Sequence, residues 1–262
     1  MELKCQTTAI KELQQLASRD RHSVLLEGVS GSGKTYLSKQ YASMLGIDDY
    51  VNTPSTVSDI RKAIDHCYEL ESKVVICIEN LDEGVLGASY TLLKFLEEPR
   101  DNIYIVVTCC NIHKVPDTII SRSSVVTLAA PTPNDIDTFI SSYMEDRREI
   151  IETRDDIRKS VKNFHDVDYC MNMTNLSYCE HLQNLVSLIQ SKKPISDIVW
   201  ALGHYADGSE VPIKFMLNYI ISNTSNSHIK THGISCMKEL DGSRIATHAV
   251  LSKFVMDCKY GE

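Results

Sequence analysis

The segment from Gly28 to Thr35, with the sequence GVSGSGKT, carries the strongest chemical signal in the chain. A glycine, four residues and then Gly-Lys-Thr is the spacing of a phosphate-binding P-loop. Glycines let a backbone fold closely around an anion, and the amides that open the following helix point at it. The sequence therefore predicts a nucleotide site. Its expected lining is Gly28, Val29, Ser30, Gly31, Ser32, Gly33, Lys34 and Thr35.

Two side chains of this segment have separate expected roles. The Lys34 ammonium is expected to contact the β- and γ-phosphates of the nucleotide. The Thr35 hydroxyl is a hard oxygen ligand of the kind that Mg²⁺ prefers. The segment thus predicts a bound nucleotide with Mg²⁺.

The elements around the P-loop predict an α/β fold. Continuous apolar runs, typical of buried strands, cover residues 23–28, 73–78, 103–110 and 123–128, and amphipathic helical stretches cover 34–45, 57–70 and 88–99. Such strands, separated by helices, indicate a parallel sheet that is covered on both faces. After the two prolines of the segment APTPND, every remaining stretch has a helical pattern.

Composition limits the classes of function. The net charge of −8 over 262 residues argues against a free-standing DNA-coating protein, although it allows a few phosphate contacts. No apolar run reaches the roughly 20 residues that span a bilayer, and the start lacks a secretory pattern. Nine cysteines without a Cys-x-x-Cys pair argue against a disulfide framework. His228, His232 and Cys236 have helical spacing, but Gly233 interrupts them and no fourth ligand is evident. We therefore expect a cytoplasmic protein. We do not expect these three residues to form a metal site.

Two segments resemble the AAA+ modules of DNA-polymerase clamp loaders. They are LLKFLEEP at 92–99 and IYIVVTCCNIHKVPDTIISRS at 103–123. The segment VNTPSTVSDIRKAID at 51–65 resembles the part of that family that leads to a DNA-facing helix. The short C-terminal block and the lack of a zinc ribbon are more similar to a phage-type small subunit, which would work in the host cytoplasm.

The resemblance implies a domain order and a set of partners. The expected order is an AAA+ core at 1–130, a helical lid at 131–190 and a helical collar at 191–262. Several such subunits, joined through their collars, bind ATP and Mg²⁺ between them. They open a sliding clamp and place it on primer–template DNA.

The resemblance also implies roles for single residues. Arg122, in the Ser121-Arg122-Ser123 turn, corresponds to an arginine finger that reaches the ATP of a neighbouring subunit. Asn111 corresponds to the first sensor, with Thr108 as the alternative. Cys109 and Cys110 stand where the family often has threonine. Arg61 and Lys62 are candidates for contacts with DNA phosphates.

Three positions depart from the family pattern. Glu79 replaces the metal-orienting Asp, and Asn80 replaces the Glu that activates water. An amide can orient water but cannot take its proton. Asp168 stands where the family has the second-sensor Arg. Asp82 and Glu83 are expected to be solvated loop residues.

These departures leave more than one function open. One hypothesis is an ATP-binding subunit whose hydrolysis is weak or depends on the assembly. The second is a structural, delta-prime-like subunit that supplies Arg122 to its neighbour. A third is another AAA+ protein, such as a helicase loader.

Overall fold

The computed structural model describes residues 3–84, 86–97, 100–142, 158–167, 176–191, 194, 196–201, 213–242 and 247–260. The chain divides into two compact units, Met1–Asp135 and Ile136–Glu262. The division of the helical part into a lid and a collar stays a prediction.

The first unit is built on a five-stranded parallel sheet in the order β2-β3-β4-β1-β5. Its strands are β1 (Ser23–Glu27), β2 (Asp49–Pro54), β3 (Val74–Glu79), β4 (Ile103–Cys109) and β5 (Ser124–Thr127). The α/β fold and the four apolar strands are confirmed. The edge strand β2 was not predicted, because its sequence DYVNTP buries only Thr53 and lacks a continuous apolar run.

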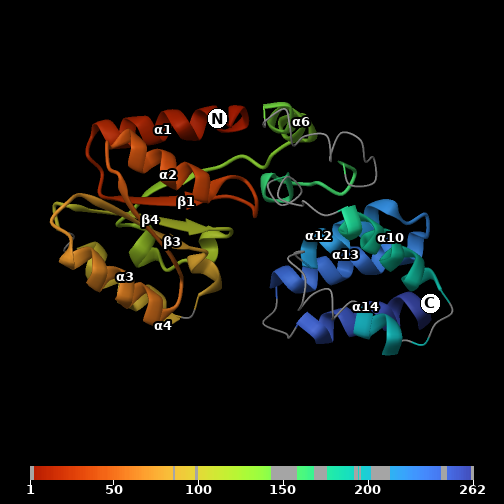
Figure 1. Ribbon diagram of the computed structural model, residues 1–262. Coiled ribbons are helices and arrows are strands. Elements are labelled where there is room, and N and C mark those ends of the chain that lie inside the picture. Colours follow the sequence, from red (N-terminus) through yellow and green to blue (C-terminus); the bar gives the residue numbers. More distant parts are fainter. Residues whose placement is uncertain are drawn as a thin grey trace. The chain divides into compact units, whose positions relative to one another are not determined.

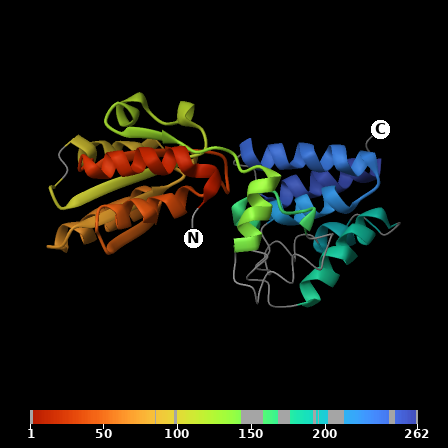
Figure 2. The same ribbon diagram turned by 90° about the horizontal axis from the view of Figure 1, so that it is seen from above.

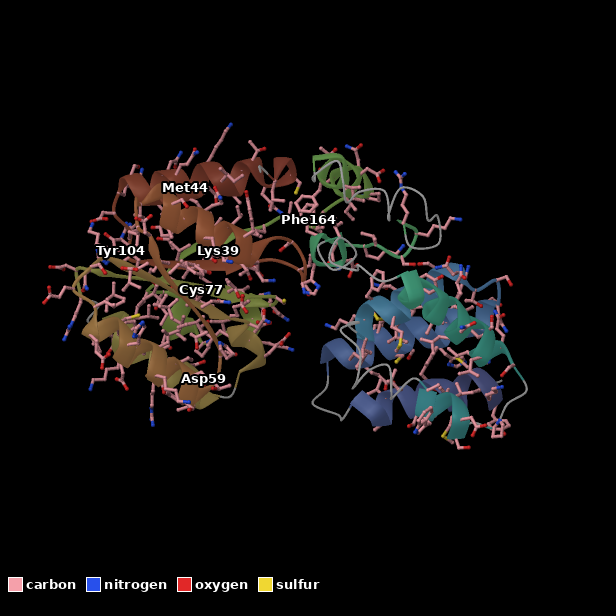
Figure 3. All side chains as sticks on the ribbon, in the orientation of Figure 1. Lys39, Met44, Asp59, Cys77, Tyr104 and Phe164 are labelled. Atoms are coloured by element: carbon pink, nitrogen blue, oxygen red, sulfur yellow. The ribbon has the colours of Figure 1, made fainter. Side chains whose placement is uncertain are left out.

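Helices cover both faces of this sheet (Figure 1). Helices α1 (Thr7–Ser18) and α2 (Lys34–Met44) pack on one face, and α3 (Val57–Glu69) and α4 (Leu86–Glu97) pack on the other. Cys77, labelled in Figure 3, lies fully buried in β3. The apolar runs of β3 and β4 follow from this burial on both faces.

Because the strands are parallel, different residues lie at the two ends of the sheet. The P-loop, Asn80 and Cys110 follow directly after β1, β3 and β4, so they meet at the carboxyl edge of the sheet. At the opposite edge, the Ser23 and Ser123 hydroxyls lie 2.9 Å apart. The register, which pairs Val24 with Ser124, places the start of β5 beside the start of β1.

The rest of the described chain is helical, as predicted. Helix α6 (Pro133–Ser142) is followed by α10 (Leu176–Gln190), α12 (Ile213–Asn223), α13 (Ser227–Gly242) and α14 (Thr247–Tyr260). Helix α13 packs against both α12 and α14, and the three lie side by side in Figures 1 and 2. A Cβ atom at Gly233 would lie 2.6 Å from Ile221 Cγ1, so close packing of α12 and α13 requires this glycine.

The described residues contain no group of three or more His, Cys, Asp or Glu side chains arranged to hold a metal ion. Among the helices of that same part of the chain, none combines the length and apolar character needed to cross a membrane.

Candidate nucleotide-binding site

The P-loop connects β1 to α2 and opens the helix with a glycine. Gly33 is the N-cap of α2 and has a φ of 98°, a left-handed conformation that is strained for a residue with a side chain. The Gly28 amide donates a 3.1 Å hydrogen bond to the Cys109 carbonyl, which fixes the start of the loop to the end of β4. The loop is thus attached to the sheet where the strands end.

Lys34 lies folded over this loop, with only 7% of its surface exposed. Its ammonium donates to the Gly28 carbonyl at 2.6 Å and to the Val29 carbonyl at 3.1 Å, and it lies 3.3 Å from Cys110 Sγ. The positive charge is therefore held at the loop itself. This position suits a group that meets phosphate oxygens.

Thr35 and Glu79 come together from α2 and β3. The Thr35 hydroxyl donates a 2.7 Å hydrogen bond to Glu79 Oε1. A hydroxyl and a carboxylate are both hard oxygen donors, which fits Mg²⁺. The sequence predicted both residues at the metal position, and the fold places them next to each other beside the P-loop.

Asn80 follows β3 in a left-handed conformation, with a φ of 52°. The backbone N–H of Asn80 donates to Thr108 Oγ1 at 3.0 Å, and its backbone carbonyl accepts from the Ser55 hydroxyl at 3.0 Å. The backbone is thus fixed from two sides. No hydrogen bond of the Asn80 side chain occurs within the described ranges, so its amide group is available to orient a water molecule.

Asp82, in the short turn η2 (Leu81–Glu83), holds the end of β4. Its Oδ1 accepts from the Cys110 amide at 3.1 Å, and its Oδ2 accepts from the Asn111 amide at 3.0 Å. The expectation that Asp82 is a solvated loop residue was wrong. Glu83 is exposed, as expected.

Asn111 is the second residue after β4, next to Cys110. Its side-chain oxygen accepts from the His113 amide at 3.0 Å and so caps the turn η3 (Ile112–Lys114). The hydroxyl of Thr108, the alternative sensor, already accepts a hydrogen bond from the Asn80 backbone N–H. Burial raises the pKa of the Cys109 thiol to about 12, so this group stays neutral and serves in packing.

Arg122 lies at the edge of the sheet opposite to the P-loop. It follows helix α5 (Asp117–Ile120) and is exposed, and its neighbour Ser123 contacts Ser23 at the start of β1. The five residues of β1 separate that start from the P-loop by about 16 Å. The guanidinium donates to the Thr118 carbonyl and to Glu97 Oε1, both at 2.9 Å. Arg122 thus lies far from the P-loop of its own chain.

The remaining predicted residues lie elsewhere. Arg61 and Lys62 are exposed on α3, where Lys62 Nζ lies 3.9 Å from Asp59 Oδ1. Asp168, and the last two residues of the LLKFLEEP segment, lie outside the described residues.

This chain is similar to known proteins both in sequence and in fold. Residues 53–132 match the family described as DNA polymerase III, delta subunit. DNA polymerase III subunit gamma of Buchnera aphidicola is 28% identical over 159 residues, which cover 49% of this chain and 43% of that relative. This chain therefore spans less than half the length of the curated relative.

Two solved structures from Thermotoga maritima are similar in fold. A DNA polymerase III gamma subunit-related protein has a TM-score of 0.56 at 14% identity, over 97% of this chain and 100% of that chain. The Holliday junction branch migration motor RuvB has a TM-score of 0.52 at 14% identity, over 95% of this chain and 81% of that chain.

The parallel sheet, the P-loop and these likenesses define an AAA+ fold of the type shared by RuvB and the clamp loaders. Such a fold implies nucleotide binding. Within this class, the sequence is similar to the gamma and delta subunits of DNA polymerase III.

Proposed function

We propose that this chain is an ATP-binding subunit of a DNA-polymerase clamp loader, which opens a sliding clamp and places it on primer–template DNA during replication. The match of residues 53–132 to the delta-subunit family supports the proposal, as does the gamma-subunit relative. The position of Arg122 is the observation that carries it. An exposed arginine at the edge away from its own P-loop fits a side chain that serves the ATP of a neighbouring subunit.

In this proposal, Gly28 to Thr35 hold the phosphates of ATP. Lys34 moves its ammonium from the Gly28 and Val29 carbonyls to the phosphate oxygens, since both are hydrogen-bond acceptors. Thr35 and Glu79 would hold Mg²⁺, directly or through water. When bound, this ion neutralises phosphate charge.

Hydrolysis is expected to be weak or to depend on the assembly. Asn80 can position water, but it cannot accept a proton, and loss of a general base costs about 10²–10⁴ in rate. Asn111 acts as the sensor of the γ-phosphate, and Asp82 fixes its backbone. An arginine finger contributes about 10³–10⁵ in related nucleotide hydrolases, so Arg122 from a neighbour has the larger effect.

The proposed partners are other loader subunits, the sliding clamp and primer–template DNA. In this proposal the core at 1–130 carries ATP, 131–190 forms a helical lid, and the collar at 191–262 joins the subunits. Arg61 and Lys62 are proposed to contact DNA phosphates, which is supported by their exposure on α3. Their pairing with backbone phosphates would give affinity without sequence preference.

Asn80 favours a second candidate, a structural delta-prime-like subunit that supplies Arg122 without hydrolysing ATP itself. Both candidates retain the P-loop and the exposed arginine. They differ in whether this chain's own site turns over in the complete loader.

A clamp-loading assay tests the proposal. The chain, its companion loader subunit and a fluorescent clamp from the same genome are mixed with ATP and primed circular DNA, and retained clamp is counted. We expect retention that is lost in Lys34→Ala and kept in Lys39→Ala, because Lys39 is an exposed lysine of the same helix. Absence of loading with every loader subunit present would refute the clamp-loader function.

A further inference from the structure

Gln6 is a buried side chain that joins three distant parts of the nucleotide-binding unit. It ends the turn η1 (Lys4–Gln6), and only 1% of its surface is exposed. Its Nε2 donates to the Ser32 carbonyl in the P-loop at 3.0 Å and to the Ala129 carbonyl at 2.8 Å. Its Oε1 accepts from the Ala129 amide at 3.0 Å. The P-loop is thereby tied to the segment that follows β5.

The hydrogen bonds of Gln6 use all the donors of its carboxamide. An amide side chain has two N–H donors and one carbonyl acceptor, and here each finds a backbone partner. A glutamate at this position would still accept the hydrogen bond from the Ala129 amide. It would, however, place a negative charge against the Ser32 and Ala129 carbonyls. The site therefore selects an amide of this length.

The bond to Ser32 has a consequence inside the P-loop. The Ser32 carbonyl and the Gly33 amide belong to one planar trans peptide, in which C=O and N–H point in opposite directions. A carbonyl directed at Gln6 therefore turns the Gly33 N–H away from Gln6. Gly33 precedes Lys34 and caps α2, so its N–H is one of the helix-opening amides that bind anions.

We infer that Gln6 is a positioning residue for the nucleotide phosphates, because it fixes the Ser32–Gly33 peptide with its N–H directed away from Gln6. The inference rests on the proposed binding of nucleotide by this P-loop. Gln6 does not contact the nucleotide itself. It acts through one peptide group, and its removal is expected to weaken the phosphate contact of Gly33 specifically.

The test compares wild type with Gln6→Met, an apolar side chain of similar length, and with Gln15→Met on the exposed face of α1 as the control. The probe is Mg·ADP. Because ADP is itself the product of ATP hydrolysis, its binding is measured without turnover. Affinity is measured with a fluorescent ADP analogue. We expect about 10- to 100-fold weaker binding in Gln6→Met, because this corresponds to the loss of one hydrogen bond to a charged acceptor. We expect no change in Gln15→Met.

An NMR measurement separates positioning from a general structural effect. Labelling with serine ¹³C-carbonyl and glycine ¹⁵N selects the glycines that follow a serine, Gly31 and Gly33. In wild type, Mg·ADP should shift the Gly33 amide strongly downfield. In Gln6→Met that shift should be lost while the response of Gly31 remains.

Each outcome decides a different point. A wild type that does not bind Mg·ADP refutes the proposed function. A wild type that binds without a downfield shift of Gly33 overturns the inference, and this result does not require a folded variant. Equal affinity and an equal Gly33 shift in Gln6→Met also overturn it. Loss of both glycine responses would assign Gln6 a structural role only.

Discussion

The guanidinium of Arg122 donates a 2.9 Å hydrogen bond to Glu97 of the same chain, at the edge of the sheet away from the P-loop. Both side chains are more than a third exposed, so solvent screens the pair and its stabilisation is about 0–1 kcal/mol. A contact this weak would not prevent Arg122 from reaching the neighbouring subunit that we propose.

Glu97→Gln should therefore release Arg122 at little cost in stability. In the assembled loader, we expect ATP turnover to rise by at most about fivefold, because an exposed pair contributes no more than about 1 kcal/mol. Steady-state phosphate release measures it. Glu69→Gln, at an exposed glutamate of α3, is the control. A fall in turnover would mean that Glu97 orients Arg122 productively.

Asn80→Glu should introduce the missing general base. Turnover in the assembly should rise, with an upper limit of about 10²–10⁴. The left-handed backbone at this position suits Asn better than Glu, so the same change should destabilise the unit by about 1 kcal/mol. Phosphate release and urea denaturation give the two values. Turnover as low as in Asn80→Ala would contradict a role for this position in water activation.

Asp82→Ala should destabilise the first unit by about 1–3 kcal/mol, because it leaves the Cys110 and Asn111 backbone amides without their acceptor. Glu83→Ala, next to it and exposed, should change stability by less than about 0.5 kcal/mol. Urea denaturation of the two variants checks the difference. Equal stabilities would show that Asp82 is dispensable for the strand end.

A pH dependence is expected from the contact of Asp20 with Tyr104, which is labelled in Figure 3. Tyr104 donates a 2.5 Å hydrogen bond to Asp20, and this bond, aided by the charge of Lys73, holds the pKa of Asp20 below its ordinary value of 3.8. A lowered pKa in the folded state stabilises the fold above pH 3.8, and that contribution is lost as pH falls through the folded-state pKa.

Asp20→Asn should therefore be less stable than wild type at neutral pH, and the difference should shrink below pH 4. Asparagine tolerates the left-handed backbone of this position, where φ is 53°, so the substitution changes the charge without adding strain. Urea midpoints at pH 7, 5 and 3.5 follow the difference. A gap that stays constant over this range would exclude the ionised carboxylate as its source.

Local patterns predicted most of the fold. What they missed depends on long-range hydrogen bonds or on the polar sequence of an edge strand. The P-loop is encoded within eight residues, and the apolar strands follow from burial on both faces. By contrast, Asp82 meets Cys110 across 28 positions, and Gln6 meets Ala129 across 123. No local spacing indicates such partners. Strand β2 was missed because an edge strand can be polar.

We propose that this chain binds ATP and supplies Arg122 to the ATP of a neighbouring subunit. The most direct measurement is ATP binding and turnover by wild type and Arg122→Ala, alone and then with companion subunit, clamp and primer–template DNA. We expect equal ATP affinity of the two isolated chains, and turnover in the assembly that falls by about 10³ or more in Arg122→Ala. Equal turnover of both proteins in the complete assembly, or loss of ATP binding by the isolated Arg122→Ala chain, would contradict it.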